Sequence, residues 1–350
     1  MKRIAIIAGG DSSEYEVSLR SAAGIYGFLD KTIYEPVIVC LHGREWKAAV
    51  NYTGEGAVTP PDAPGSAIEW VDIDKNDFSY TSGTGRHVFD YAYITIHGTP
   101  GENGLLQGYL DMLGMPYSCC DVLSAGMTFN KYVCNHYLSG FGVNISPSVL
   151  LRRGDSISDD EVLHKIGLPC FIKSNVGGSS YGCTKVKTRE DIQPAISIAF
   201  AEGDEVIIEA FMKGVEVTCG MYRVQGKEVV FPITEVVTHN EFFDYDAKYK
   251  GQVEEITPAR ISDTLRDAVQ AQTRHIYGVL GCKGIIRVDY ILVPVDEPDD
   301  ADRHIADGHR IMLLEVNTTP GMTATSFIPQ QVRAAGLSMT DVLRDIIENR

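Results

Sequence analysis

The amino-acid sequence predicts an α/β protein with a parallel sheet in its N-terminal part and an α+β arrangement in its C-terminal part. Short apolar runs alternate with helical patterns in the first part, whereas longer strands of antiparallel character begin at Glu216. A chain of 350 residues is long enough for several compact units. We therefore expect three units, at residues 1–125, 126–215 and 216–350.

The first unit opens with a strand, a glycine turn and a helix. Residues 2–8 form an apolar run, and apolar side chains then recur at helical spacing over residues 19–29. Ser13 and Glu16 have the spacing of a capping box, which predicts that the helix begins there. A second apolar run at 34–41 predicts a parallel neighbour for the first strand.

The remainder of the first unit contains one more predicted strand and a glycine-rich loop. Residues 51–67 are rich in Gly and Pro and indicate an irregular excursion. Residues 91–96 predict a strand that leads into the loop 97–104, which we call the His97 loop. Ligands bind in such sheets at the carboxyl ends of parallel strands, so this loop is a candidate binding segment.

The second and third units contain further helices and strands. The second is expected to hold helices at 131–138 and 189–201, and strands at 169–174 and 205–211. The strands expected in the third unit cover residues 216–223, 228–236, 284–293 and 311–317. The polar, acidic segment 294–310 predicts a solvated loop that joins the last two strands.

Charged residues interrupt the last two apolar strands. The period of two places Arg287 and Asp289 on one face, and likewise Glu315 and Asn317. If the strands pair as a hairpin, two carboxylates, an amide and a guanidinium meet on one sheet face. Such oxygen ligands suit Mg²⁺, which fills its shell with water and substrate phosphates. A surface Arg–carboxylate pair is the alternative, but charges in such apolar strands favour a site.

A lysine and a Gly/Ser-rich loop follow the strand at 169–174. Lys173 precedes backbone N–H groups and hydroxyls that can bind phosphate oxygens. Gly177 and Gly182 have Walker A spacing, but Cys183 occupies the lysine position, which excludes a P-loop NTPase. Alone, this loop is also compatible with an ordinary turn between strands.

Four other segments are weaker candidates. Lys131 is either a second phosphate cation or a solvated helix lysine. Glu209 and Glu216 bracket a connection that suits a purine nucleoside, although two surface glutamates explain the pattern equally well. The aromatic and charged segment 242–249 predicts a lid over reactive phosphates, or a loop anchored by its aromatic side chains. The tight turn 317–323 could place a backbone N–H at a reacting carbonyl.

Composition limits the classes of partner. The net charge of −16 disfavours a nucleic-acid surface, which needs clustered cations, and no apolar run approaches the length of a membrane span. The eight cysteines include no CxxC pair and lie mostly in apolar segments. We therefore expect reduced core thiols in a cytoplasmic protein.

Five motifs, in order along nearly the whole chain, resemble the D-alanine–D-alanine ligase family. They are Gly9-Gly10-x-Ser12-x-Glu14-x-Glu16-Val17-Ser18, His97-Gly98-x-x-Gly101-Glu102-x-Gly104, Gly178-Ser179-Ser180, Asp244-Tyr245-x-Ala247-Lys248-Tyr249 and Glu315-x-Asn317-Thr318-x-Pro320-Gly321-Met322-Thr323. Each motif alone is weak, but together they are specific. The resemblance implies an ATP-grasp fold and ADP-forming ligation of two D-alanine molecules through an acyl phosphate, for peptidoglycan synthesis.

The resemblance also implies a role for each matching residue. ATP contacts are expected at Lys131, Lys173, Ser180, Glu209, Ala210, Met212, Glu216 and Lys248. Two Mg²⁺ ions, or Mn²⁺ in their place, are expected at Asp289, Glu315 and Asn317. Catalytic roles are expected for Glu14, Ser179, Tyr249, Arg287 and Gly321, and substrate contacts for Glu14, His97, Ser326 and Phe327. A homodimer and a monovalent cation are further expectations.

Three alternatives remain. A ligase that makes D-Ala–D-Lac or D-Ala–D-Ser would share these motifs, although Tyr249 argues against the D-lactate form. A catalytically silent nucleotide-binding protein would be expected to lose the metal ligands or Arg287, which are present. A nicotinamide-dependent dehydrogenase is disfavoured because no GxGxxG motif follows the first strand.

Overall fold

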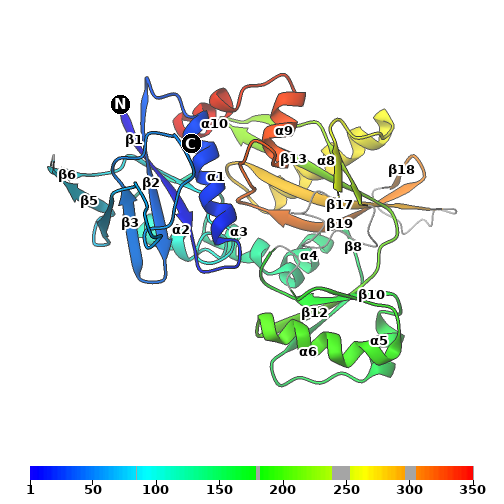
Figure 1. Cartoon of the computed structure of the whole chain (residues 1–350). Helices are drawn as coiled ribbons and strands as arrows, with labels where there is room; N and C mark the ends of the chain where they lie inside the picture. The colour runs from blue at the N-terminus through cyan, green and yellow to red at the C-terminus, as the bar shows by residue number, and fades with distance from the viewer. Residues whose placement is uncertain (84, 179–181, 239–252, 296–304, 350) are drawn as a thin grey trace.

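A computed structural model describes residues 1–83, 85–178, 182–238, 253–295 and 305–349. These residues form three sheets, each with its own helices (Figure 1). The sheet that contains β10 and β12 forms a separate lobe below the other two, and the segment with α4 leads into it (Figure 1). The mixed α/β architecture predicted from the sequence is confirmed.

The first sheet has the order β6-β5-β4-β3-β2-β1-β7. Its strands are β1 (Lys2–Gly9), β2 (Tyr34–His42), β3 (Glu45–Ala49), β4 (Trp70–Asp74), β5 (Ser79–Ser82), β6 (Gly85–His87) and β7 (Tyr91–Ile94). Strand β1 pairs in parallel with both β2 and β7, which confirms the predicted parallel sheet. Strands β3 to β6 extend it with antiparallel pairs that the sequence analysis did not predict.

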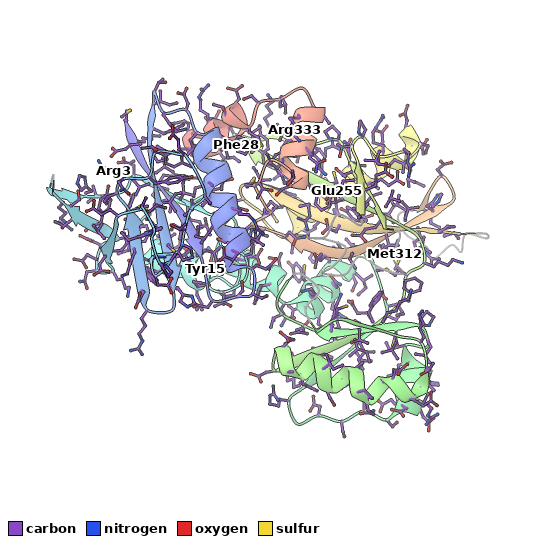
Figure 2. The ribbon with its side chains drawn as sticks, in the orientation of Figure 1. Arg3, Tyr15, Phe28, Glu255, Met312 and Arg333 are labelled. Atoms are coloured by element: carbon purple, nitrogen blue, oxygen red, sulfur yellow. The ribbon has the colours of Figure 1, made fainter. Side chains whose placement is uncertain are left out.

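Helix α1 (Tyr15–Phe28) packs against β1 and β2, with Tyr15 and Phe28 at its opposite ends (Figure 2). The predicted capping box is wrong: Glu14 is the N-cap residue, and no side chain caps the helix. The Ser12 hydroxyl instead accepts a hydrogen bond from the Glu14 N–H at 3.2 Å. This brings the Glu14 side chain to the carboxyl end of β1, at the edge of the sheet where ligands bind.

Three helices connect the first sheet to the second lobe. They are α2 (Leu105–Met112), α3 (Val122–Phe129) and α4 (Lys131–Ser139). Asp121 caps α3 by accepting from the Ser124 N–H at 3.1 Å, and Asn130 caps α4 by accepting from the Val133 N–H at 3.0 Å. Because Asn130 ends α3 and begins α4, Lys131 is fixed at the first position of α4.

The second lobe is an antiparallel sheet in the order β11-β10-β12-β9. Its elements are β9 (Ser148–Arg152), α5 (Asp159–Lys165), β10 (Cys170–Ser174), β11 (Thr184–Val186), α6 (Ile192–Glu202) and β12 (Glu205–Ala210). A short 3₁₀ turn, Arg189–Asp191, precedes α6, so the helix predicted at 189–201 is mostly confirmed. Apolar side chains of β10, β12 and α6 form the core of this lobe.

The third sheet has the central order β16-β15-β13-β17-β19-β18, with β14 paired to β13 and β8 (Asn144–Ile145) paired to β19. Its other strands are β13 (Val215–Val224), β14 (Lys227–Val230), β15 (Thr234–Thr238), β16 (Val253–Ile256), β17 (Ile286–Pro294), β18 (Ile305–Ala306) and β19 (His309–Asn317). Helix α8 (Asp263–Val279) shares a core with one face of this sheet.

Two details of the third sheet differ from the sequence-based prediction. The single strand expected at 228–236 is two strands, β14 and β15, separated around the fully buried Phe231, whose N–H donates to Gly220 O at 2.9 Å. The segment 294–310, expected to be a loop, contains the short strand β18. The hairpin of β17 and β19 is confirmed: Arg287 pairs with Asn317, and Asp289 with Glu315.

The N-terminal and C-terminal parts share one hydrophobic core. Buried residues of β1 and α1 pack in the same cluster as residues of helices α9 (Phe327–Ala334) and α10 (Met339–Glu348). All eight cysteines are free, and seven are buried, as predicted. Within the described residues, no helix is both long enough and apolar enough to cross a bilayer.

Candidate active site

A cavity of about 690 Å³ lies between the second lobe and the third sheet, and the loop after β1 closes one side of it. Ten of the predicted site residues line it: Lys131, Lys173, Glu209, Ala210, Met212, Glu216, Arg287, Asp289, Glu315 and Phe327. The structure therefore brings together the two lysines, the connection between β12 and β13, and the charged face of the hairpin.

The charged face of β17 and β19 consists of Arg287, Asp289, Glu315 and Asn317, and we call it the metal face. Arg287 donates two hydrogen bonds to the Asp289 carboxylate, at 2.9 Å from Nε and 2.8 Å from Nη2. Asn317 Nδ2 lies 3.1 Å from Asp289 Oδ2 and 3.5 Å from Glu315 Oε1. Burial by itself would lower the pKa of Arg287, but the carboxylates of Asp289, Glu315 and Glu216 outweigh it and raise that pKa.

The donor set of the metal face fits magnesium. It offers two carboxylates and one side-chain amide on a single sheet face, held by the register of the hairpin. Within the described ranges, no group of three or more His, Cys, Asp or Glu side chains could hold a metal ion. A small protein donor set is typical of Mg²⁺, which completes its shell with water and substrate phosphates.

Two lysines lie close together in the cavity. Lys173 Nζ is 2.6 Å from Glu209 Oε2, and both side chains are largely buried. Lys131 Nζ donates to Gly177 O at 2.5 Å. Burial is the largest cause that lowers the pKa of Lys131, and the nearby Lys173 cation lowers it further, although Glu315 and Glu209 oppose this. A bound phosphate would relieve the repulsion between the two cations, so the pair is suited to anion binding.

The connection between β12 and β13 forms an apolar end of the cavity. Ala210, Phe211 and Met212 follow Glu209 there, and Glu216 lies opposite on β13. Phe211 packs against Phe171 with ring centroids 5.9 Å apart. Apolar and aromatic lining next to two carboxylates suits a purine base with its ribose.

The sequence analysis missed several lining residues, mainly the apolar ones. They include Phe129, Phe171, Cys183, Phe211, Ile291 and Leu314. Phe171 could have been found, because it precedes Lys173 by two residues on the same strand and so shares its face. The position of Cys183 depends on how the chain returns through β11, which no local pattern indicates.

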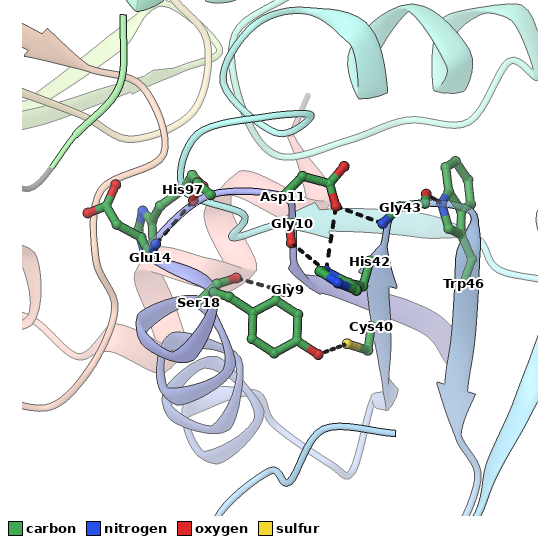
Figure 3. A network of polar contacts seen from close by, with 12 residues as sticks. Gly9, Gly10, Asp11, Glu14, Ser18, Cys40, His42, Gly43, Trp46 and His97 are labelled. Carbon is green, nitrogen blue, oxygen red and sulfur yellow. Dashed lines mark hydrogen bonds and ion pairs between the residues drawn. The ribbon is translucent and has the colours of Figure 1, made fainter. Parts of the chain in front are cut away.

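Glu14 and His97 lie near each other beyond the carboxyl end of β1 (Figure 3). A Cβ atom at Gly178 would clash with the Glu14 carboxylate, so this side chain reaches the backbone of the segment that follows β10 in the second lobe. His97 is buried, its Nε2 lies 3.4 Å from the Ser21 hydroxyl, and its carbonyl accepts from Ser12 Oγ at 2.7 Å. Neither residue lines the large cavity itself.

The same view shows polar contacts that hold the ends of β1 and β2 together (Figure 3). Asp11 Oδ1 accepts from the Gly43 N–H at 2.6 Å and lies 3.6 Å from His42 Nδ1. Asp11 lines the cavity, so these contacts fix one part of its wall.

The turn 317–323, which we call the substrate turn, lies beside the metal face. A Cβ atom at Gly321 would stand 3.0 Å from the Ser326 hydroxyl, and that hydroxyl accepts from the Thr323 N–H at 3.1 Å. Arg287 lies over the ring of Phe327 at 5.2 Å. The predicted residues Gly321, Ser326, Phe327 and Arg287 thus lie in one region.

Four predicted site residues fall outside the described residues. They are Ser179, Ser180, Lys248 and Tyr249. Their roles stay predictions.

Comparison with known proteins agrees with this arrangement. Residues 3–120 match the family described as D-ala D-ala ligase N-terminus, and residues 137–348 match D-ala D-ala ligase C-terminus. A D-alanine–D-alanine ligase of Bacteroides fragilis is 61% identical over 351 residues, covering 100% of both chains.

Solved structures are similar over nearly the whole chain. A D-Ala:D-Ser ligase from Enterococcus faecalis has a TM-score of 0.80 at 28% identity, covering 99% of this chain and 98% of its own. A D-alanine–D-alanine ligase from Bacillus anthracis complexed with ATP has a TM-score of 0.72 at 27% identity, covering 100% and 97%. With its ATP-grasp fold and two matching family segments, this chain belongs to the D-alanine–D-alanine ligase family.

Proposed function

We propose that this protein joins two D-alanine molecules into D-alanyl-D-alanine with the cleavage of ATP to ADP and phosphate, for peptidoglycan precursor synthesis. The observation that carries this proposal is the convergence of Lys131, Lys173 and the metal face on one cavity. The family and the 61% identical relative, itself a D-alanine–D-alanine ligase, support the same reaction.

The reaction needs two steps. The carboxylate of the first D-alanine attacks the γ-phosphorus of ATP, which forms D-alanyl phosphate and releases ADP. The amine of the second D-alanine, after losing a proton, then attacks the acyl carbon, and phosphate leaves with the electron pair of the broken C–O bond. Both steps build negative charge, so positioned cations and N–H donors accelerate them.

The described residues divide these tasks. Lys131 and Lys173 bind and orient the ATP phosphates, with Glu209, Ala210, Met212 and Glu216 around the nucleoside. Asp289, Glu315 and Asn317 would hold Mg²⁺, or Mn²⁺ in its place, and the bound ions would supply charge neutralisation on the phosphoryl oxygens.

Substrate positions follow the same division. Glu14 holds the ammonium group of the first D-alanine, with His97 near it. Arg287 and the Gly321 N–H stabilise the oxyanion of the tetrahedral intermediate. Ser326 and Phe327 contact the second substrate. Outside the described residues, Ser179, Ser180, Lys248 and Tyr249 are expected to complete the site.

The main alternative function is a ligase that takes D-serine or D-lactate, and not D-alanine, as its second substrate. The similarity to a D-Ala:D-Ser ligase shows that this fold also serves that product. We favour D-alanine, because the 61% identical relative is a D-alanine–D-alanine ligase, whereas identity to the D-Ala:D-Ser ligase is 28%. A silent nucleotide-binding protein is disfavoured because Arg287, Asp289 and Glu315 lie together in the cavity.

The test is an incubation of the protein with ATP, Mg²⁺ and D-alanine, D-serine or D-lactate, with ADP, phosphate and products quantified by mass spectrometry. We expect one ADP and one phosphate per D-alanyl-D-alanine. The variant Asp289→Asn should lose this activity, whereas Asp267→Asn, at an exposed position on α8, should keep it. AMP with pyrophosphate, or ATP turnover without dipeptide, would contradict the proposal.

Assembly and organisation are further parts of the proposal. A homodimer is supported by exposed apolar side chains on the neighbouring helices α2 and α3, namely Leu105, Met112 and Leu123. Light scattering should give twice the chain mass, and Leu123→Glu should give the monomer mass. We also propose units at 1–125, 126–215 and 216–350 and a cytoplasmic location. A monovalent-cation requirement is a further proposal, and exchange of K⁺ for choline would test it.

A further inference from the structure

Glu102 occupies a junction between two segments that serve different substrates. It lies in the His97 loop after β7, and its carboxylate accepts a hydrogen bond from the Gly98 N–H at 2.7 Å. The other oxygen accepts from the Thr319 hydroxyl, also at 2.7 Å. Thr319 belongs to the substrate turn, 217 residues further along the chain. One carboxyl group thus connects the two segments.

The His97 loop is fixed on its other side to the first-substrate region. Ser12 donates to His97 O at 2.7 Å, and the Asp11 N–H donates to Thr99 O at 2.8 Å. A Cβ atom at Gly98 would clash with the Ser12 side chain. The loop and the segment that carries Glu14 therefore behave as one packed unit.

The substrate turn contains groups that serve the second step of the reaction. Asn317 of the metal face begins this turn, and Gly321 follows Thr319 by two residues. A second contact, made by Ser21, joins the turn to the loop: its hydroxyl accepts from the Met322 N–H at 3.3 Å and lies 3.4 Å from His97 Nε2. Glu102 and Ser21 thus hold the turn at two points.

We propose that Glu102 is a positioning residue that fixes the substrate turn against the His97 loop and so holds the two D-alanine subsites at reacting distance. This inference rests on the proposed ligase function. Glu102 itself acts through Gly98 and Thr319, and it is distinct from the residues assigned above to ATP, metal or substrate.

The junction accommodates two protonation states. When Glu102 is ionised, the Thr319 hydroxyl donates to it. When Glu102 is protonated, its O–H can donate to the Thr319 oxygen, and Thr319 then donates to Ile96 O, which lies 3.2 Å away. Burial of the carboxyl group is the main cause that raises the pKa of Glu102 to about 7, against the lowering effect of Thr319 and Gly98.

Two charged groups from other elements also act on this carboxyl. Glu14 at the start of α1 raises the pKa of Glu102, and Lys131 at the start of α4 lowers it. A glutamine at position 102 can reproduce the protonated pattern, because its oxygen accepts from Gly98 and its amide donates to Thr319. Leucine can reproduce neither contact.

The experiment compares Glu102→Leu, Thr319→Val and Glu102→Gln with the wild type. For each protein, two concentrations of D-alanine are measured: the one that half-saturates the first subsite and the one that half-saturates the second. The Kd for ATP is measured in a separate experiment. The matched control is Thr273→Val, which removes an equally buried hydroxyl that contacts Tyr290 on the opposite face of the third sheet.

We expect Glu102→Leu and Thr319→Val to lower kcat/KM for the second D-alanine by about tenfold or more, since loss of one buried charged hydrogen bond can exceed that ratio. The Kd for ATP should not change, and Glu102→Gln should restore the wild-type constants at pH 7. The double variant Glu102→Leu/Thr319→Val should be no worse than Glu102→Leu alone, because the leucine variant has already lost the contact with Thr319.

Unchanged D-alanine constants in folded Glu102→Leu, or in Thr319→Val should the leucine variant not fold, would overturn the proposal. An equal loss of ATP binding in a folded variant would also overturn it, because Glu102 would then act on the whole site and not on the D-alanine subsites. Failure of the proposed function is distinguishable, since the wild type itself would then form no dipeptide.

Discussion

Removal of the guanidinium of Arg287 is the sharpest test of the metal face. Arg287→Met keeps the length of the aliphatic chain but deletes both hydrogen bonds to Asp289. The side chains of this pair are 13% and 8% exposed. The variant therefore leaves a carboxylate in a buried position without its cation.

The size of the effect follows from burial. Breaking a buried ion pair by removing one partner costs about 3–5 kcal/mol in the free energy of unfolding. The variant keeps Asn317, which donates to Asp289 at 3.1 Å. We therefore expect a loss in the free energy of unfolding at the lower end of this range, about 3 kcal/mol. Mg²⁺ should restore part of this stability, because it replaces the lost positive charge. Turnover should fall by about 10²-fold or more, the scale of losing one oxyanion donor.

The matched control is Arg3→Met. Arg3 Nη2 donates to both oxygens of the Glu35 carboxylate, at 3.0 and 2.8 Å, but these side chains are 21% and 42% exposed. This substitution should cost about 1 kcal/mol or less. Urea unfolding with and without Mg²⁺, together with dipeptide formation rates, measures all these quantities. Equal destabilisation of the two variants, or normal turnover of folded Arg287→Met, would refute the reasoning.

Three further predictions concern the two carboxylates of the metal face, Lys173 and Glu102. Asp289→Asn and Glu315→Gln should each reduce turnover by about 10²-fold or more and raise the Mg²⁺ concentration needed for half-maximal rate; a folded variant with normal Mg²⁺ dependence would remove that residue from the metal site. Lys173→Met should weaken ATP binding in calorimetry by about tenfold or more, since a charge-assisted phosphate contact is lost, and an unchanged Kd would argue against its phosphate role. The pKa of Glu102, raised from 4.5 to about 7, means that the folded protein binds this proton more tightly than the unfolded chain. Its stabilising contribution is therefore complete below pH 4.5 and is lost as the pH rises through 7, so Glu102→Gln should flatten that part of the stability profile in urea titrations; an unchanged profile would contradict this assignment.

The grouping of side chains on the metal face could be predicted from the sequence because its pattern is local. Because side chains alternate with a period of two, Arg287 and Asp289 share one face of their strand, and so do Glu315 and Asn317. This holds independently of the tertiary structure. Only the pairing of the two strands had to be assumed, and the structure confirms it. The parallel start of the chain was predictable for the same reason, since β1 and β2 are continuous apolar runs.

The missed features depend on contacts between distant segments. Strands β4 to β6 are short and partly exposed, so their alternation is too weak to distinguish them from loops. The break between β14 and β15 occurs because Phe231 is buried against Tyr222 and other residues of the shared core, a requirement that the local pattern does not express. The role proposed for Glu102 likewise depends on a partner more than 200 residues away.

The shared core also determines when this chain can finish folding. Ile346 and Ile347 of α10 are buried in the same cluster as Ile4 and Ile6 of β1, and Glu348 contacts the hydroxyl of Tyr34 at 2.8 Å. The two ends of the chain accordingly lie close together (Figure 1). During synthesis, the first sheet emerges from the ribosome long before α10 is made. One apolar face of this sheet therefore stays exposed to solvent until translation ends. A nascent chain arrested just before residue 339 should therefore be a preferred client of chaperones that bind exposed apolar segments, whereas the released protein should not.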